Sequence, residues 1–190
     1  MNSQVSQSQS SHAQPTNFLN QLCVGQSLDA TLEKMLPWLG DQLQCDRVFL
    51  YVRSPDTQRG RVPFCWVRRP EMPKIYDPDW KYEPADLPQR DPMFAAALKA
   101  QPSLFIEDVE TANPRQVNRD FEQQNFSHRA LIHGHLCIER KLWGVLQPCV
   151  FDHPRQWSQR DRHLIEQVVG WLAPLTREYV DCYAPQPEHC

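Results

Sequence analysis

The stretch Arg129–Phe151, RALIHGHLCIERKLWGVLQPCVF, decides the fold class. Its two apolar runs, residues 129–139 and 142–151, flank a short charged turn near Arg140 and Lys141. Apolar, β-rich runs on either side of a tight polar turn predict a β-hairpin. A second pair of runs, DRVFLYVR at 46–53 and RVPFCWVR at 61–68, flanks the turn-rich spacer SPDTQRG. Two hairpins predict a mostly antiparallel sheet.

Amphipathic helices are predicted near both ends of the sequence. After Ser27, a residue type suited to a helix N-cap, apolar residues recur on one helical face as far as residue 43. Pro37 is expected to kink or split this helix. A final helix is predicted after Ser158, where Asp161 nearly completes a capping box. Pro174 is expected to bend or end it.

The middle of the chain is richer in prolines. Residues 55–92 contain eight of them and predict a long loop, of the kind that is often functional. Asp91 followed by Pro92 predicts the start of the short helix MFAAALKA. A short strand, SLFIEDV, is predicted at 103–109. Asn113 followed by Pro114 repeats the capping pattern, and the helix after it is expected to turn Val117 and Phe121 inward.

The predicted element order is helix, hairpin, loop, helix, strand, helix, hairpin, helix. It indicates an α+β sandwich, with the terminal helices on one face of the sheet and the loop and middle helices on the other. A cavity is expected between the sheet and the loops. We expect one domain over residues 17–180, a disordered Ser- and Gln-rich tail over residues 1–16, and a frayed tail over residues 181–190.

Composition argues against several classes of function. The formal net charge is −3 and no run of Lys or Arg occurs, which argues against nucleic-acid binding. No apolar run approaches the ~18 residues of a membrane span, and we expect a soluble, cytoplasmic protein. The seven cysteines are dispersed without a C-x-x-C pair and are expected to be reduced. Since no catalytic motif such as G-x-S-x-G or H-E-x-x-H is present, we expect a protein that is not an enzyme.

Three short motifs carry a family resemblance. LQCDRVFLY at 43–51, KLWGVL at 141–146 and PRQW at 154–157 resemble a GAF domain, and more narrowly the phytochrome and cyanobacteriochrome branch. The resemblance implies a bilin pocket, in which a Cys-His pair on a middle helix attaches the pigment. The matching position, near Val117 and Asn118, has no cysteine. The resemblance therefore implies a non-covalent tetrapyrrole or no ligand.

Two groups of residues are candidates for the ligand pocket. Where the photoreceptor branch has Val-Val-Pro-Ile, this chain has His133-Gly134-His135-Leu136, so the pocket wall is altered. The second group is aromatic, and aromatic residues with a polar end favour binding surfaces. They could line a pocket for a planar ligand or pin the long loop to the core, and if exposed they would indicate a partner surface. This aromatic group consists of Trp66, Tyr76, Trp80 and Tyr82.

A metal or haem site is a further hypothesis. His133, His135 and Cys137 alternate along one predicted strand, so their side chains share one face. Imidazole and thiolate are ligands for zinc or haem iron, and His128 could add a fourth group. The alternative is a polar or interface face of the strand without a ligand.

From these patterns we expect a stand-alone GAF regulatory or sensor domain that acts through protein–protein contacts, with a non-covalent small ligand or none. Its partner, or a second copy in a homodimer, is expected to contact the first and last helices. The alternatives are an accessory or assembly factor for a photosynthetic or bilin-related complex, and a metal or haem sensor.

Overall fold

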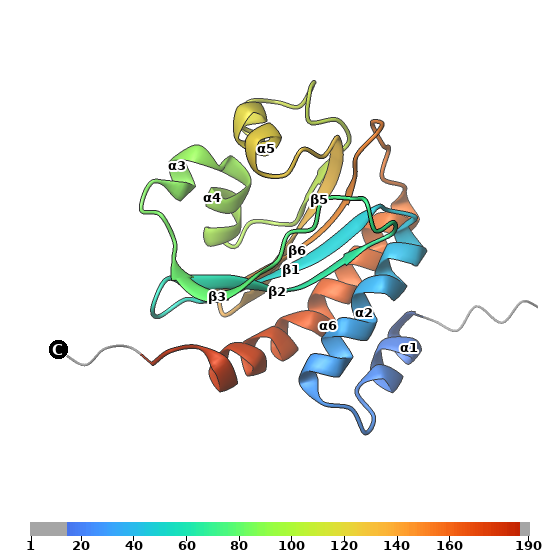
Figure 1. Cartoon of the computed structure of the whole chain (residues 1–190), viewed down its shortest axis with the longest axis vertical. Helices are drawn as coiled ribbons and strands as arrows, with labels where there is room; N and C mark the ends of the chain where they lie inside the picture. The colour runs from blue at the N-terminus through green and yellow to red at the C-terminus, as the bar shows by residue number, and fades with distance from the viewer. Residues whose placement is uncertain (1–14, 187–190) are drawn as a thin grey trace, which may run out of the picture.

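The fold is described from a computed structural model, over residues 15–186. Six strands form one antiparallel sheet in the order β3-β2-β1-β6-β5-β4 (Figure 1). Both predicted hairpins, β1–β2 and β5–β6, are confirmed, and pairing of β1 with β6 joins them at the centre of the sheet. The strands are β1 Arg47–Ser54, β2 Arg59–Val67, β3 Asp77–Tyr82, β4 Leu104–Ile106, β5 Ala130–Ile138 and β6 Lys141–Val150.

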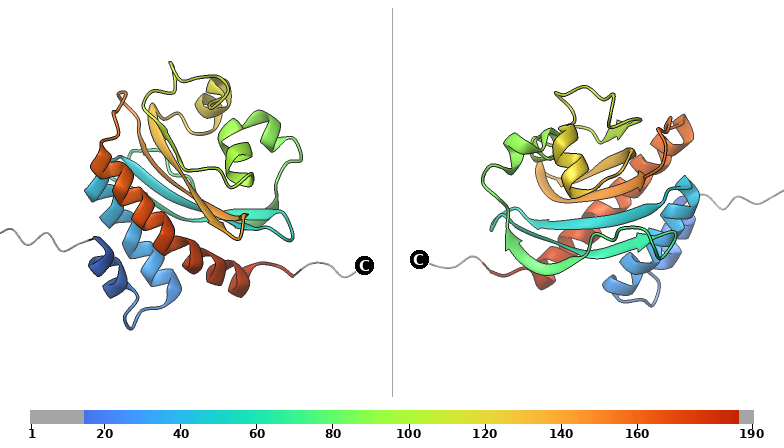
Figure 2. Two further views of the ribbon diagram at one scale, coloured as in Figure 1. Left: turned by 180° about the vertical axis from the view of Figure 1, so that it is seen from behind. Right: turned by 45° about the horizontal axis from the view of Figure 1, so that its top comes forward.

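The helices divide between the two faces of the sheet (Figures 1 and 2). α1, α2 and α6 cover one face, and α3, α4 and α5 lie over the other. The predicted α+β sandwich is therefore confirmed. The helices are α1 Pro15–Leu22, α2 Leu28–Leu43, α3 Leu87–Arg90, α4 Pro92–Leu98, α5 Arg119–Asn125 and α6 Gln159–Tyr183.

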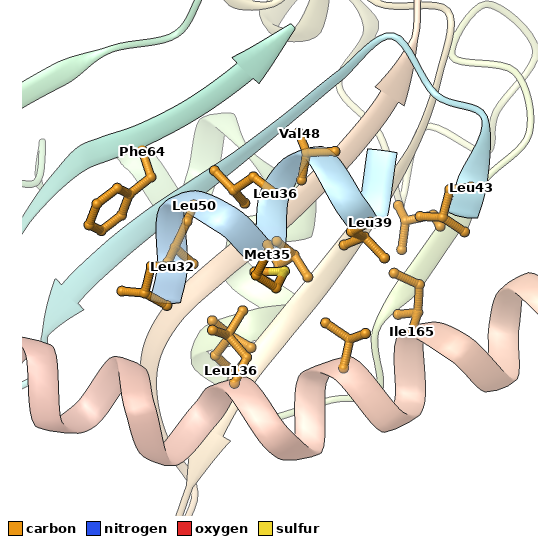
Figure 3. Close-up of a cluster of buried hydrophobic side chains, with 14 of the residues drawn as sticks. Leu32, Met35, Leu36, Leu39, Leu43, Val48, Leu50, Phe64, Leu136 and Ile165 are labelled. Atoms are coloured by element: carbon orange, nitrogen blue, oxygen red, sulfur yellow. The ribbon is translucent and has the colours of Figure 1, made fainter. Parts of the chain in front are cut away.

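The largest apolar core lies between the sheet and the helices α2 and α6 (Figure 3). The predicted face of α2 points into it, and its residues meet Val48 and Leu50 of β1 and Ile165 of α6. Full burial of each such side chain contributes about 1.5–3 kcal/mol. The α2 residues in this core are Leu32, Met35, Leu36, Leu39 and Leu43.

Both helical prolines are tolerated, which corrects part of the prediction. α2 runs through Pro37 without a break, and α6 continues past Pro174 to Tyr183. Beyond Pro174, Tyr179 and Val180 are buried in the main core. Packing of this last part of α6 therefore outweighs the hydrogen bond that proline removes.

Two predictions for the middle segment were wrong. The long loop contains β3, a polar edge strand that pairs only with β2, and an edge tolerates Pro78. The helix expected after Asn113 begins instead at Arg119, because Asn118 is its cap and accepts from Phe121 N at 3.3 Å. Asn113 caps a turn by accepting from Arg115 N.

The domain limits differ slightly from the prediction. α1 begins at Pro15, inside the segment expected to be a tail, and α6 extends to Tyr183. The rest of the two predicted tails, residues 1–14 and 187–190, lies outside the described residues. Between residues 15 and 186, no helix is both long and apolar enough to span a bilayer. The cysteines in this range are free thiols.

Candidate functional site

A cavity of about 370 Å³ lies between the sheet and the segment that carries α3, α4 and α5. Because side chains alternate along a strand, alternate residues of β1 and β6 face it, together with His133 of β5. Its walls are mainly aromatic and aliphatic. The strands contribute Phe49, Tyr51, His133, Val145 and Gln147, and the covering segments contribute Ile75, Leu87, Asp91, Phe94, Phe121 and Phe126.

Three floor residues form a row across neighbouring strands. Phe49 pairs with Gln147, and the β5–β6 pairs on either side, Leu131 with Cys149 and Gly134 with Leu146, place His133 opposite Gln147. Gln147 is only 3% exposed, and its Nε2 has no hydrogen-bond partner among residues 15–186. A buried N–H group without a partner costs about 1–3 kcal/mol, so Nε2 of Gln147 is a candidate contact for a ligand.

His133 presents a hydrogen-bond acceptor. His135 Nδ1 lies 2.7 Å from Gln101 O, and a carbonyl only accepts, so Nδ1 carries the proton. Burial lowers the pKa of both histidines, although the Gln101 bond opposes this at His135, so we take both as neutral at pH 7. His135 Nε2 then accepts from His133 Nδ1, 2.9 Å away. This relay leaves Nε2 of His133, on a side chain that lines the cavity, as an acceptor.

Most charges at the cavity are already paired. Arg53 Nε donates to both oxygens of Glu83, at 2.8 and 3.1 Å, and the Tyr51 hydroxyl donates to the same carboxylate at 2.6 Å. Lys81 Nζ lies 2.6 Å from Asp77 Oδ2. These pairs leave little net charge on this side of the cavity.

Arg61 also has partners elsewhere. Its guanidinium donates to Pro78 O at 3.1 Å and to the Tyr179 hydroxyl, on α6. The same group lies over the Trp80 ring, 4.9 Å from its centroid. Arg61 lines the cavity, but its guanidinium reaches Tyr179 of α6, which covers the opposite face of the sheet.

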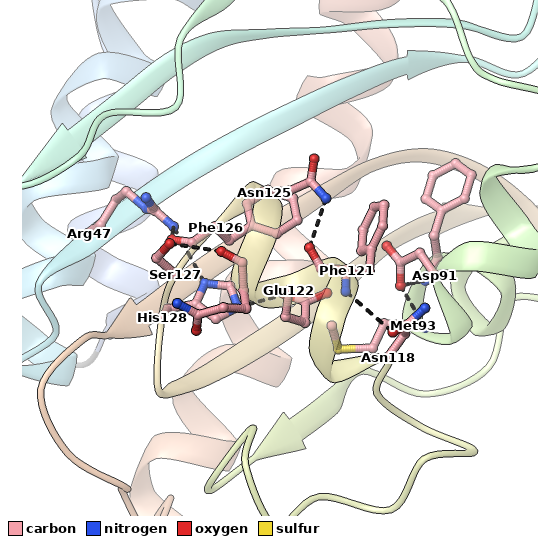
Figure 4. Close-up of polar contacts among 12 residues, drawn as sticks. Arg47, Asp91, Met93, Asn118, Phe121, Glu122, Asn125, Phe126, Ser127 and His128 are labelled. Atoms are coloured by element: carbon pink, nitrogen blue, oxygen red, sulfur yellow. Dashed lines mark hydrogen bonds and ion pairs between the residues drawn. The ribbon is translucent and has the colours of Figure 1, made fainter.

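Asp91 is the exception among the acidic residues. It is 7% exposed and caps α4, with Oδ1 accepting from Met93 N at 2.9 Å and Phe94 N at 3.1 Å. Burial raises its pKa to about 6, while the two cap bonds lower it. No Lys, Arg or His of residues 15–186 forms an ion pair with it. Figure 4 shows it at the start of α4, near Phe121 of α5.

A buried polar cluster fixes α5 to β1 (Figure 4). Arg47, which is 0% exposed, donates to Pro73 O at 2.9 Å and approaches His128 Nδ1 at 3.4 Å. His128 Nε2 lies 2.7 Å from Glu122 Oε2. A guanidinium can only donate, so Nδ1 accepts and Nε2 donates to Glu122. We call these three residues, Arg47, His128 and Glu122, the buried clamp.

The clamp is strongly desolvated. Burial, assisted by the charge of Arg47, lowers the pKa of His128 to about 3. Burial raises the pKa of Glu122 to about 8, against the effect of Arg47. His128 is therefore neutral at pH 7, which agrees with the direction of its hydrogen bonds.

Comparison with known proteins identifies this architecture. The GAF domain family matches residues 27–174. The chain belongs to the GAF family. Among curated protein sequences, no match is found. The residues that line the cavity lie within the matched GAF domain.

Solved GAF domains share the fold at low identity. The GAF domain of an Acinetobacter phosphoenolpyruvate-protein phosphotransferase is 12% identical, with a TM-score of 0.67 over 92% of this chain and 95% of that one. The phycocyanobilin-bound GAF domain of a cyanobacterial phytochrome is 17% identical, with a TM-score of 0.68 over 90% and 98%. The chromophore-binding domain of the R. palustris bacteriophytochrome RpBphP3 is 16% identical, with a TM-score of 0.68 over 88% and 60%. These likenesses show the fold.

The predicted pocket residues of this GAF domain separate into two groups. Tyr82 and His133 line the cavity, and His135 supports His133 from behind. The other three lie elsewhere: Trp66 packs against Gly40 of α2, Trp80 packs against Arg61 and the main core, and Tyr76 is 63% exposed beside a separate hollow at α2 and β2. The two tryptophans therefore follow the alternative that pins the loop and its flanking strand to the core.

The predicted metal ligands are not assembled into a site. His133, His135 and Cys137 do share one face of β5, but Cys137 Sγ lies 3.7 Å from Ala97 O, and the two imidazoles bond to each other. Within residues 15–186, no three His, Cys, Asp or Glu side chains are grouped as metal ligands. His128, the possible fourth ligand, belongs to the buried clamp.

The sequence prediction missed Gln147, Asp91 as a cavity residue, and the partners of His128. The sequence carried no sufficient signal for Gln147. The hairpin turn at residues 139–140 alone would place Leu146 opposite His133, and a β-bulge between Leu136 and Cys137 shifts the register by one residue to Gln147. At the position matching the pigment cysteine, Val117 is buried and Asn118 caps α5. No cysteine is among the residues that line the cavity.

Proposed function

We propose that this GAF domain is a regulatory sensor that holds a small ligand without a covalent bond, in the cavity between the sheet and α3–α5. One observation carries the proposal: the floor of an aromatic cavity presents the unpartnered Gln147 amide beside the acceptor nitrogen of His133. Together they offer a donor and an acceptor to one planar molecule. Such a cavity, apolar with a few convergent polar groups, is typical of ligand sites.

A tetrapyrrole is the alternative ligand, since one solved relative is bound to phycocyanobilin. The residues present fit it poorly. Its two propionates would need cations, but Arg53, Arg61 and Lys81 already have partners. At about 370 Å³, the cavity also lies near the lower end of the ~300–1,000 Å³ of ligand pockets. We therefore propose a smaller ligand without acidic groups.

Production of the full chain in cells that make a bilin distinguishes these ligands. We expect the purified protein to be colourless after gel filtration, and the denatured chain to show no bilin fluorescence with zinc. A bound pigment with a visible absorption band would contradict the choice of a smaller ligand. The wild-type chain would then be classed as a tetrapyrrole binder.

Gln147→Leu tests the role of the cavity floor. Removing an unpartnered buried amide will raise the free energy of unfolding of the ligand-free protein by about 1 kcal/mol. The same change will abolish the rise in Tm that one- and two-ring aromatic compounds cause in the wild-type chain. Urea unfolding and a thermal-shift screen provide the two measurements.

Gln21→Leu on α1 is the matched control, because this exposed glutamine lies outside the cavity lining and has no buried side-chain atom without a partner. It will change stability by less than about 0.5 kcal/mol and leave the screen unaffected. A wild-type chain that no compound stabilises, together with a destabilised Gln147→Leu, would refute the sensor proposal.

The signal would leave this domain through its terminal helices. α2 and α6 cover the sheet face opposite the cavity, so we propose that a protein partner or a second copy contacts them. Size-exclusion chromatography with light scattering, with and without ligand, tests the homodimer. An accessory or assembly factor that kept only the scaffold would have a cavity filled by its own side chains, so the open cavity favours a sensor.

A further inference from the structure

We propose that the ligand of this cavity is a protonated aromatic amine, whose ammonium group binds the Asp91 carboxylate while its ring lies among the aromatic walls. The inference rests on the function proposed above and gives its ligand a chemical class. It depends on the charge balance of the cavity, the composition of its walls and the geometry of the Asp91 carboxylate.

The charge balance leaves one acidic group without a cation. Of the acidic residues at the cavity, Glu83 is held by Arg53 and Asp77 by Lys81. Asp91 has no such partner among residues 15–186. Burial is the main cause of the raised pKa of Asp91, and Glu122 of α5 raises this pKa further. A cation in the cavity would supply the missing charge.

The carboxylate of Asp91 has a free side. Both cap bonds to α4 use Oδ1, at 2.9 and 3.1 Å, and Oδ2 has no hydrogen bond to any residue of the described part of the chain. Asp91 itself lines the cavity. A buried carboxylate is costly unless it is paired, and an ammonium donor is the strongest pair available to it.

The walls around Asp91 suit a cation with an apolar body. Phe94 of α4 and Phe121 of α5 line the same cavity, and Phe49, Tyr51 and Phe126 add further rings. The electron-rich faces of such rings attract cations, more strongly when water is excluded. The acceptor nitrogen of His133 favours a ligand whose ring also carries an N–H or O–H.

Matched indole probes test the charge. Tryptamine carries an ammonium group, tryptophol replaces it with a hydroxyl, and indole-3-propionate carries a carboxylate. By calorimetry at pH 7, we expect the Kd of tryptamine to be at least about tenfold lower than that of tryptophol, with no binding of the propionate, since charge-assisted bonds are about twice as strong as neutral ones.

Asp91→Asn separates the charge of this residue from its capping role. Asparagine caps helices as well as aspartate, so the fold is kept while the carboxylate charge is removed. We expect the preference for tryptamine over tryptophol to disappear. Asp86→Asn is the matched control: Asp86 stands at the N-cap of α3 but is exposed and makes no side-chain cap bond, so the preference will persist.

The binding will also depend on pH. Because burial raises the pKa of Asp91 to about 6, this carboxyl is mostly protonated at pH 5 and mostly charged at pH 7. The Kd of tryptamine will therefore fall about tenfold between these values, and will stay constant in Asp91→Asn. The other titratable groups that face Asp91 from the elements around it are Glu122 of α5, whose pKa is about 8, and His133 of β5, which is neutral.

The outcomes separate the two proposals. Equal binding of tryptophol and tryptamine, or tighter binding of the propionate, would overturn the amine inference and leave the sensor proposal standing. If none of the three probes binds the wild-type chain, the amine inference is overturned, and the wider aromatic screen decides the sensor proposal. An unchanged preference in a folded Asp91→Asn would also overturn the inference.

Discussion

Arg47→Met will lower the free energy of unfolding by about 1–3 kcal/mol, the cost of leaving buried acceptors without their donor. The change deletes the donor to Pro73 O and the charge beside His128 and Glu122. Glu122 Oε1 already lacks a partner in the described chain, so this carboxyl group would keep only its hydrogen bond with His128. Urea unfolding at pH 7, followed by circular dichroism, measures the loss.

A triple variant, Arg47→Met with His128→Leu and Glu122→Met, is the control. When all members of a buried ionic cluster are replaced by apolar residues of similar size, stability is often kept or raised. We therefore expect the triple variant to be more stable than Arg47→Met alone. A loss below about 1 kcal/mol in the single variant would contradict the clamp as a stabilising unit.

The clamp also illustrates what the sequence could not predict. Arg47 and His128 are 81 residues apart, and their contact depends on β1 lying at the centre of the sheet with α5 above it. The periodicity of apolar residues predicts the secondary structure of each segment separately. It does not predict a contact between two residues so far apart in the sequence. From the sequence, Arg47 is a charged residue at the start of a predicted strand. In the fold, its side chain is fully buried.

Helix N-caps were predicted correctly from the sequence where hydrogen bonds within one turn determine where the helix begins. The Ser158–Asp161 capping box and the Asp91 cap formed as predicted, because both bonds lie within one turn. The same reasoning failed at Asn113, because Asn118 offers an equally good cap closer to the apolar residues that α5 presents. When two equally suitable N-cap residues lie so close together, only tertiary packing decides which of them begins the helix.

The candidate site was half predictable. His133 and His135 follow from strand alternation, whereas the place of Gln147 depends on the β-bulge between Leu136 and Cys137, which shifts the hairpin register by one residue. The aromatic walls from α4 and α5, and the position of Asp91 in the cavity, require the path of the long segment between β2 and β5. That segment contains the edge strand β3, whose sequence lacks the alternation of apolar and polar residues by which strands are recognised.

Gly144→Ala will destabilise the protein by about 2–3 kcal/mol, because overpacking a close-packed interior has costs of this size. A Cβ at residue 144 would lie 2.5 Å from Tyr51 O, in the strand paired with β6, and 3.1 Å from Thr176 Cγ2 on α6. The carbonyl belongs to the central β1–β6 pairing and cannot move without breaking it. Methyl addition here therefore strains both the sheet and its contact with α6.

Gly170→Ala on α6 is the matched control, since a Cβ at this exposed helical position meets nothing within 4 Å. It will raise stability by about 0.5–1 kcal/mol through the higher helix propensity of alanine. Chemical unfolding of both variants gives the comparison. If Gly144→Ala were as stable as the wild-type chain, the central strands would be more loosely packed than the β1–β6 geometry requires.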